Sequence, residues 1–584
     1  MRRFTCDFET TTDENDCRVW AYALCEIGKP ENFLYGTNID ELMDWCRNQK
    51  DNVDLYFHNL KFDGAFITYW LETNGYQWIP EIKDAADNSY TTLITNMGAW
   101  YSIEIYFEVK GHHRNKVRIY DSLKILNFSV EDIAKGFGLP ISKLELDYTT
   151  YREPGHKLTQ HEIDYIRNDV EIVARALDYF FKQGHTKMTI GSDALAHFKS
   201  MCPDFRNLFP VLDYDIDRDI RQAYKGGFTY LNPLYKEKEG GSGWTLDVNS
   251  LYPYILSSTV LPVRTPLPFE GKYVYDSQHP LYVQAISCRF QIKPGKIPSI
   301  QIKSSFAFRP NEYLESSNGE LVCLMLTNPD LELFFEQYDV MDIQWQGGWK
   351  FEGVEGLFSE FIGYWTKKKI QADKEGRKPL RMLAKTIMNS TYGKFGTNPL
   401  GAKKRPYIGD DGALHEIYLD IEERKPIYVP VAAFTTAYAR CKTIRTSQAI
   451  RDWSLKNKGY DAYIYSDTDS ISVSKLDLHD LQEIGKFVDI DNYELGKWKI
   501  ETRFYRSKWL KSKCYLKTLN NGLNSVTVAG LPKKLGHIVN YDNFKVGFNT
   551  ADFTDEEIGE AGRKLTYKHV PGGVVLVPTD FSIN

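Results

Sequence analysis

The 584-residue chain lacks the features that mark secreted, membrane or zinc-binding proteins. Its nine cysteines are scattered and include no CxxC pair, which offers no structural zinc site and is typical of a reducing cytosol. The start, MRRFTCDFET, has no apolar signal-peptide core, and no apolar run approaches the roughly 18 residues of a membrane-spanning helix. We therefore expect a cytoplasmic protein without a membrane segment.

The chain also lacks low-complexity tracts and an excess of basic residues. A net charge of −6 argues against a protein that coats nucleic acid by bulk charge. Basic residues instead concentrate in two runs, 367–385 and 501–517, which could be solvated surfaces or local nucleic-acid contacts. The length and the ordinary globular composition indicate several domains with large cores.

The most informative feature that is present is an apolar stretch ending in two aspartates. In AYIYSDTDS, the run from Tyr463 to Tyr465 is typical of a buried strand, and Asp467 and Asp469 follow in a tight turn. Carboxylates two residues apart on an extended turn repel each other unless a cation lies between them. The pattern predicts a divalent-metal site that handles phosphate, although Asp and Thr are also ordinary turn residues.

Two further elements lie upstream of this turn. LDVNSLYPYI is again an apolar strand that ends in an aspartate, Asp247, followed by a polar turn and an aromatic residue. In LAKTIMNSTYGKFG, Lys385, Asn389 and Tyr392 follow one another at helical spacing and share one stripe. A cationic and aromatic stripe beside a carboxylate cluster suits a nucleoside triphosphate.

The first third of the chain holds a second group of acids. RRFTCDFETTT predicts a strand that carries Asp7 and Glu9 on one face. LYFHNLKFDGAF supplies Asp63, and a strongly periodic helix further on carries Tyr165 and Asp169 one turn apart. Four carboxylates can hold two metal ions, one to activate water and one to stabilise a leaving oxygen.

In order and spacing, the first three elements resemble motifs A, B and C of the family B DNA polymerases, and the second group of acids resembles that family's three exonuclease motifs. Several further stretches are similar to one branch, the protein-primed polymerases of small tailed bacteriophages (the phi-twenty-nine type). They are YFHNLKFDGAF, RIYDSLKILNFSV, AYKGGFT, SKCY and PGGVVLV. The departures are small: Ser466 stands where the branch often has a cysteine, and Cys514 occupies the middle of its KxY motif.

The resemblance implies a multidomain α/β protein with an RNase H-like 3′–5′ exonuclease domain and a right-hand polymerase of palm, fingers and thumb. It also implies two terminal-protein-region insertions, TPR1 and TPR2. The implied order is exonuclease domain 1–187, first part of the palm 188–258, TPR1 259–356, fingers 357–395, TPR2 396–429, second part of the palm 430–529 and thumb 530–584. Within TPR2, GDDG between alternating segments predicts a β-hairpin beside the DNA.

The resemblance also assigns roles to individual residues. At the polymerase site the catalytic acids would be Asp247, Asp467 and Asp469, with Asp247, Asp469 and the Val248 carbonyl as metal ligands. The nucleotide would contact Tyr252, Lys369, Lys385, Asn389 and Tyr392. At the exonuclease site Asp7, Glu9, Asp63 and Asp169 would hold metals, with Glu145 as a further candidate ligand and with Tyr165 and Lys143 in catalysis. DNA would contact Thr10, His58, Asn59, Phe62, Ser122, Leu123, Phe128, Tyr148, Tyr224, Gly226, Gly227, Lys513 and Tyr515.

As a member of this branch, the chain is expected to be a replicative DNA-directed DNA polymerase that is protein-primed, processive, strand-displacing and proofreading. The implied cofactors are two Mg²⁺ per site, with Mn²⁺ as an alternative, and the substrates are dNTPs. The implied partners are DNA and a terminal protein that serves as primer, and the implied setting is a monomer in the cytoplasm of a bacterial host.

Two alternatives belong beside this expectation. A primer-independent polymerase of the same branch would carry a lysine-bearing, KTRG-like motif between motifs A and B, and the sequence shows none. A DNA-binding assembly protein with inactive sites is disfavoured because acids stand at all seven expected positions.

Overall fold

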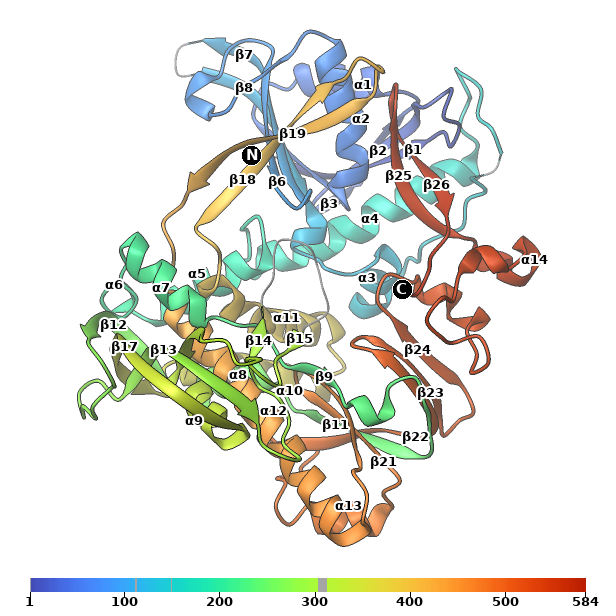
Figure 1. Cartoon of the computed structure of the whole chain (residues 1–584). Coiled ribbons are helices and arrows are strands. Elements are labelled where there is room, and N and C mark those ends of the chain that lie inside the picture. The colour runs from blue at the N-terminus through green and yellow to red at the C-terminus, as the bar shows by residue number, and fades with distance from the viewer. Residues whose placement is uncertain (1, 111–112, 149, 303–311) are drawn as a thin grey trace.

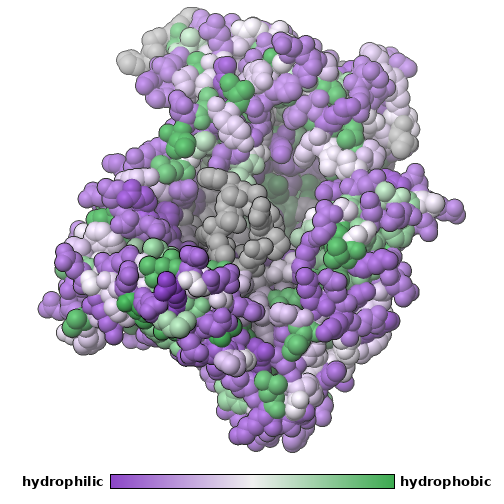
Figure 2. All heavy atoms as spheres, viewed as in Figure 1, coloured by the Kyte–Doolittle hydropathy of each residue, from purple (hydrophilic) through white to green (hydrophobic). Residues whose placement is uncertain are grey.

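The structure is a computed structural model that describes residues 2–110, 113–148, 150–302 and 312–584. Figure 1 shows an amino-terminal body at the top, a second sheet with long helices below it, and carboxyl-terminal segments that return upward to the first body. Figure 2 shows this face as mostly hydrophilic and hollowed between the upper and lower bodies. Among the described helices, none has both the length and the apolar character of a membrane span.

The upper body is built on a ten-stranded sheet, the amino-terminal sheet, with strand order β19-β18-β6-β7-β8-β4-β1-β2-β3 and with β5 beside β6. β1 is an internal strand that lies between β4 and β2, antiparallel to β2 and parallel to β4. The strands from the first third of the chain are β1 (Arg2–Thr10), β2 (Val19–Glu26), β3 (Lys29–Gly36), β4 (Val53–Phe57), β5 (Gln77–Trp78), β6 (Ser89–Thr95), β7 (Trp100–Lys110) and β8 (His113–Asp121).

Four helices belong to this body: α1 (Ile39–Arg47), α2 (Leu60–Thr73), α3 (Val130–Phe137) and α4 (Gln160–Lys182). The long helix α4 begins at a capping box in which the Thr159 hydroxyl accepts from the backbone of Glu162 and the Glu162 carboxylate accepts from the backbone of Thr159. Its apolar stripe packs on β1 and β2, so the helix presents Tyr165 and Asp169 to the strand that carries Asp7 and Glu9.

The hairpin expected within residues 396–429 is present as β18 (Leu400–Ile408) and β19 (Leu414–Glu423), which turn at the predicted GDDG. It does not stand free, because β18 pairs with β6 and so extends the amino-terminal sheet. The indole of Trp100 donates to Glu416 Oε1 at 3.0 Å across this junction. The sequence predicted the hairpin but not the sheet that it joins.

The lower body centres on an eight-stranded sheet, the central sheet, with strand order β24-β23-β22-β11-β21-β20-β9 and with β10 beside β22. Its strands are β9 (Thr229–Leu231), β10 (Glu239–Gly240), β11 (Gly243–Val248), β20 (Tyr463–Asp467), β21 (Ser470–Ser474), β22 (Trp498–Lys511), β23 (Cys514–Leu519) and β24 (Asn524–Val528). Its helices are α8 (Leu251–Ser258), α12 (Val429–Lys458) and α13 (Leu478–Ile484), and α5 (Ile190–Met201), α6 (Phe205–Leu208) and α7 (Tyr214–Ala223) connect the two bodies.

Two further units flank the central sheet. Between β11 and the long helices, a four-stranded insertion sheet forms in the order β12-β17-β13-β16, from β12 (Val260–Phe269), β13 (Leu281–Ile292), β16 (Val322–Thr327) and β17 (Tyr338–Glu355), with α9 (Asn328–Gln337) and the small pair β14 (Gln301–Ile302) and β15 (Glu312–Tyr313). Next come two packed helices, α10 (Ser359–Lys374) and α11 (Lys378–Phe395).

The carboxyl-terminal segment contains α14 (Asp555–Ile558) and a hairpin of β25 (Lys564–Val570) and β26 (Gly573–Thr579). Figure 1 shows this hairpin reaching the upper body, and Val570, Val574 and Val575 are buried in the core of the amino-terminal sheet. Its turn holds Gly572 at φ +100°, where an added Cβ would lie 1.9 Å from the carbonyl oxygen of Cys17. Only glycine permits both this backbone conformation and this close approach.

We expect Gly572→Ala to undock the carboxyl-terminal hairpin from the amino-terminal sheet, because the new methyl group and the Cys17 carbonyl cannot share the space. Limited proteolysis should then cut the hairpin faster than in the unchanged protein. Gly547→Ala is the matched control, since Gly547 also has a positive φ (90°) but open space around an added Cβ. Equal cleavage of the two variants would show that the contact does not hold the hairpin.

Candidate active sites

The acids of the first candidate site come together on neighbouring strands of the central sheet. Asp247 lies near the end of β11, opposite Ser470 of β21, and the backbone N–H of Val248 donates to the Asp469 carbonyl at 2.8 Å. Asp467 ends β20, and the turn to β21 closes when the Asp469 N–H donates to the Asp467 carbonyl at 2.7 Å. The structure therefore brings Asp247 together with Asp467 and Asp469, which lie about 220 residues further along the sequence.

The charges of these acids interact. Burial and the charges of Asp247 and Asp467 raise the pKa of Asp469 to about 6. Lys499 Nζ lies 3.0 Å from Asp247 Oδ1, and Lys513 Nζ lies 3.6 Å from Asp467 Oδ1. Each lysine supplies positive charge beside a carboxylate of the cluster.

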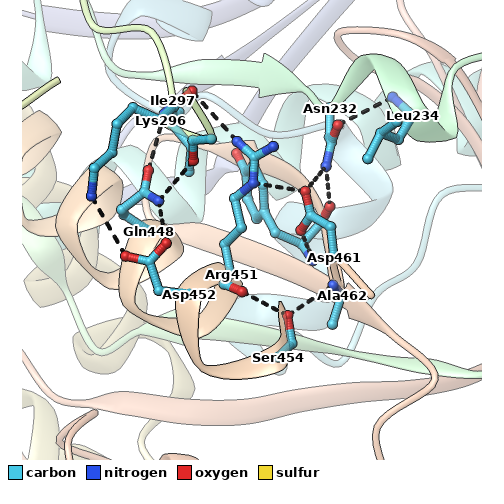
Figure 3. A network of polar contacts seen from close by, with 12 residues as sticks. Asn232, Leu234, Lys296, Ile297, Gln448, Arg451, Asp452, Ser454, Asp461 and Ala462 are labelled. Carbon is cyan, nitrogen blue, oxygen red and sulfur yellow. Dashed lines mark hydrogen bonds and ion pairs between the residues drawn. The ribbon is translucent and has the colours of Figure 1, made fainter. Parts of the chain in front are cut away.

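A buried polar network fixes the strand that leads to Asp467 (Figure 3). Asp461 precedes β20, and its carboxylate accepts from Asn232 Nδ2 at 2.9 Å and from the Tyr463 N–H at 3.0 Å. Arg451 of α12 pairs with the same carboxylate at 2.7 Å. Gln448, one turn earlier, binds the backbone of Ile297, so the network also attaches the loop before β14 to α12.

Helices α10 and α11 bring the nucleotide candidates to the same region. Lys385, Asn389 and Tyr392 share one face of α11, and the rings of Tyr392 and Tyr252 stack with centroids 4.1 Å apart. Lys369 comes from α10, and burial together with the charges of Arg381 and Lys385 lowers its pKa. Crowded cations of this kind are stabilised when an anion such as a triphosphate binds among them.

The YKGG loop joins the two bodies and is held from below by a buried arginine. Arg440, 3% exposed, donates to the carbonyls of Lys225 and Gly226 at 2.9 Å each and pairs with Asp330 at 2.6 Å. Gly227 lies against the turn between Asp467 and Asp469, because a Cβ added there would meet Thr468 Oγ1 at 2.6 Å. Sequence reasoning missed Arg440 and Lys499, because both lie outside the motifs and only the tertiary structure places them.

The acids of the second candidate site converge from three elements of the upper body. Asp7 and Glu9 lie on β1, Asp63 on α2 and Asp169 on α4. Burial, and next the charge of Asp169, raises the pKa of Asp7 to about 7, and burial with neighbouring charges raises the pKa of Glu9 and Asp63 well above the usual range. In the described part of the chain, Asp63 Oδ1 and Asp169 Oδ1 are buried without a hydrogen-bond partner.

One cation and two phenols complete this cluster. Lys143 pairs with Asp169, whose charge raises the lysine pKa although burial opposes the shift. The hydroxyls of Tyr148 and Tyr165 lie 2.6 Å apart, and Lys143 Nζ lies 5.3 Å from the centroid of the Tyr165 ring.

The four acids open into a cavity of about 770 Å³ whose lining also includes Thr10, His58, Asn59, Phe62, Lys143, Tyr148 and Tyr165. The far wall comes from the carboxyl-terminal hairpin through Leu565, Tyr567, Val575, Leu576 and Pro578. Asn59 Nδ2 donates to the Tyr567 hydroxyl at 3.1 Å. This wall could not be predicted from the sequence, because its residues lie more than 500 positions from Asn59.

Other predicted residues lie apart from the acids or behind the surface. Ser122 is fully buried, bonds His58 Nδ1 at 3.0 Å and donates to the Phe57 carbonyl, while His58 Nε2 bonds the Phe128 carbonyl at 2.8 Å. These groups brace the turn after β4. Leu123 follows in the same short helical turn, outside the cavity lining.

Glu145 is exposed and does not line the cavity; its carbonyl accepts from His161. Its placement gives no support to the expected role as a metal ligand.

The turns of four predicted motifs contain non-glycine residues with positive φ: Asn59 (80°), Ser250 (54°), Thr468 (57°) and Lys513 (56°). L-residues rarely adopt this left-handed region, and such strain persists where the surrounding structure enforces it, often at functional sites. At Asn59 and Ser250 the strained residue begins the helix after a motif strand, which turns the chain sharply beside the acids.

Both acid clusters fit divalent cations. Carboxylates with raised pKa values, such as Asp469 and Asp7, are stabilised by a bound cation, and in the upper cluster the buried oxygens of Asp63 and Asp169 also lack a partner among the described residues. A third acidic group, Asp477, His479 and Asp480, lies on the far end of the central sheet, where Asp477 and Asp480 form the capping box of α13. That helix cap accounts for the group without a metal.

Comparison with known proteins agrees with these two sites. Residues 46–483 match the family described as DNA polymerase type B, organellar and viral. The chain is a type B DNA polymerase. It is 44% identical to the DNA polymerase of Bacillus phage M2 over 601 residues, which cover 100% of this chain and 99% of that protein. It is 43% identical to the DNA polymerase of Bacillus phage phi29 over 604 residues, with the same coverage of both chains.

Solved structures give the same result. The polymerase superposes on phi29 DNA polymerase in an orthorhombic crystal form with a TM-score of 0.92 at 41% identity, covering 100% of both chains. For the phi29 complex with primer-template DNA and incoming nucleotide substrates, the TM-score is 0.90 at 42% identity, again over 100% of both chains. The predicted family and the predicted fold class, a multidomain α/β protein with exonuclease and polymerase domains, are confirmed.

The raised pKa of Asp469 predicts how pH acts on the metal-free protein. The folded state holds a proton on Asp469 more tightly than the unfolded chain does. Below about pH 4 Asp469 is mostly protonated in both states and hardly affects the free energy of unfolding. Above about pH 6 its ionisation lowers that free energy by about 3 kcal/mol, from a pKa shift of roughly two units. Asp469→Asn should therefore raise the thermal midpoint in EDTA at pH 8 and lose this advantage near pH 4. Asp410→Asn, an exposed acid of the hairpin turn, is the control; an equal gain from both variants would contradict the assignment.

Proposed function

We propose that the polymerase extends a DNA primer along a DNA template at the site of Asp247, Asp467 and Asp469, and that it removes 3′ ends at the site of Asp7, Glu9, Asp63 and Asp169. The single observation that carries this proposal is the presence of two separate carboxylate clusters in one chain, one half-buried in the lower body and one largely buried in the upper body. The similarity to phi29 DNA polymerase, which has been solved with primer-template DNA and with single-stranded DNA, supports it.

At the polymerase site, Asp247, Asp469 and the Val248 carbonyl would hold divalent cations, with Mg²⁺ as the proposed ion and Mn²⁺ as an alternative. Bound there, the ions would lower the pKa of the primer 3′ hydroxyl and offset the charge that develops on pyrophosphate. Lys369 and Lys385 would bind the triphosphate oxygens of a dNTP. The stacked rings of Tyr252 and Tyr392 would form the floor under the sugar and base, and Asn389 lies on the same face of α11.

At the exonuclease site, Asp7, Glu9, Asp63 and Asp169 would hold the ions, and Tyr165 and Lys143 would orient the attacking water and neutralise charge on the scissile phosphate. Thr10, Asn59, Phe62 and Tyr148 line the cavity in which a frayed single strand would lie. The YKGG loop, held by Arg440, lies between the two bodies and would pass the strand from one site to the other.

Two features support processive, strand-displacing synthesis. The β18–β19 hairpin and the carboxyl-terminal hairpin both attach to the amino-terminal sheet, and their tips meet, since a Cβ on Gly412 would lie 3.5 Å from Pro571. Together they would close a ring around the hollow seen in Figure 2, which would retain the duplex and force the non-template strand aside. Priming from a terminal protein, a monomeric working state and a bacterial cytoplasmic setting complete the proposal, which the similarity to the DNA polymerases of Bacillus phages supports.

Separate sites should separate by mutation. Asp469→Ala should abolish dNTP incorporation and retain 3′–5′ degradation of single strands, whereas Asp7→Ala with Glu9→Ala should abolish degradation and retain incorporation. Primer extension and single-strand digestion, measured on the same preparations with Mg²⁺, check both. Loss of both activities in either variant, with an unchanged circular dichroism spectrum, would contradict the two-site proposal.

The ring predicts the effect of removing the β18–β19 hairpin. Replacing residues 400–425 by a short Gly-rich joint should keep single-nucleotide addition near normal but shorten products on long templates and stop synthesis at duplex blocks. The defect should grow with salt, because phosphate contacts weaken and no ring remains to retain the DNA. Digestion of short single strands is the folding control. Full-length displacement products at moderate salt would exclude this role.

A further inference from the structure

A buried lysine lies between the polymerase acids and the KCY motif without forming an ion pair. Lys517 of β23 is 7% exposed, and within the described residues no carboxylate pairs with its ammonium. Burial lowers its pKa to about 8, against a weaker opposing effect of Glu501. Lysines are almost never buried without a partner, and an apolar side chain of similar volume would serve packing at lower cost.

The Lys517 side chain reaches from β23 to β11 and β21, the strands next to the polymerase acids. Lys517 Nζ donates to Thr245 Oγ1 at 2.9 Å and to Ser472 Oγ at 3.4 Å, and these two hydroxyls lie 3.2 Å apart. Thr245 and Ser472 face each other on β11 and β21, two residues along the strands from the pair formed by Asp247 and Ser470. Since a strand rises about 3.4 Å per residue, the ammonium is anchored about 7 Å along the strand from Asp247.

Three aromatic rings lie around the same ammonium. Lys517 Nζ lies 5.5, 5.0 and 4.8 Å from the ring centroids of Phe504, Trp509 and Tyr515. Trp509 and Tyr515 pack on Tyr465 of β20, at 5.0 and 5.5 Å. The hairpin formed by β22 and β23 therefore curls over the sheet, and Lys517 joins its inner surface to β11 and β21.

The tip of this hairpin reaches the acids. The Lys513 N–H donates to the Tyr465 hydroxyl at 2.9 Å, and that hydroxyl donates to Asp467 Oδ2 at 3.3 Å. Lys513 and Tyr515, the two residues proposed to steady the primer, thus have two attachments: one at the tip through Tyr465, and one behind the rings through Lys517.

We propose that Lys517 is a positioning residue for primer binding: its ammonium fixes the KCY hairpin, and with it the Tyr515 ring, at a set place over the strands that carry Asp247 and Asp469. The charge matters because a cation holds the faces of three rings and two hydroxyls at once, whereas an apolar side chain would fill the space without fixing their orientation. This inference rests on the proposed binding of primer-template DNA.

Lys517→Met tests the proposal, because methionine keeps the length and packing and removes the charge. The dissociation constant for primer-template DNA should rise roughly tenfold, the scale of one desolvated cation–π contact. The rate of single-nucleotide addition from preformed complexes should stay within about twofold, and the thermal midpoint should stay equal or rise, because an unpaired buried charge has been removed. Lys508→Met, which removes a lysine whose ammonium contacts the Tyr541 carbonyl, should leave primer affinity unchanged.

Thr245→Val supplies the second arm. If Lys517 acts through the Thr245 hydroxyl, the valine variant should weaken primer binding in the same direction, and the double variant should be no weaker than Lys517→Met alone. Unchanged affinity in Lys517→Met, fully additive effects, or a loss of affinity matched by a loss of thermal stability would each overturn the proposal. Failure of the proposed function would instead appear as no binding of primer-template DNA by the unchanged protein.

Discussion

The repulsion between like-charged carboxylates is the constraint on which this structure depends. Both sites hold several acids close together and at least partly shielded from water, an arrangement that raises the pKa of Asp469 to about 6 and that of Asp7 to about 7. Such clusters lower the stability of the folded protein, because each ionised carboxylate destabilises its neighbours. The surrounding fold must therefore hold these carboxylates in place, and many of its polar contacts do so.

The two sites hold their acids in place in similar ways. In each, an internal strand of a sheet carries one or two acids, and a left-handed residue, Asn59 or Thr468, turns the chain beside a further acid. A lysine then lies against the cluster, Lys143 in the upper body and Lys499 in the lower. The buried network around Asp461 holds the strand that leads to Asp467 and also fastens the insertion to α12. Stability and site geometry are therefore set by the same contacts.

The carboxyl-terminal segment connects the two sites in space. Its hairpin closes the far wall of the exonuclease cavity, while the strands just before it, β22 and β23, fold over the polymerase acids. The β18–β19 hairpin, inserted between two helices of the lower body, completes the amino-terminal sheet. Each body therefore takes strands or walls from distant parts of the chain.

The sequence by itself determined the local chemistry: strands that end in acids, a helix with Lys385, Asn389 and Tyr392 on one face, a hairpin at GDDG, and the family to which these belong. These features could be predicted because strand and helix periods and turn residues are encoded within a few positions. Only the tertiary structure decided what long-range packing brings together. It joined β18 to β6, placed Tyr567 opposite Asn59, paired Lys499 with Asp247, left Glu145 outside its cluster and brought the Lys517 ammonium to the Thr245 hydroxyl. Each of these depends on residues tens to hundreds of positions apart, whose meeting is set by sheet order and burial rather than by local pattern.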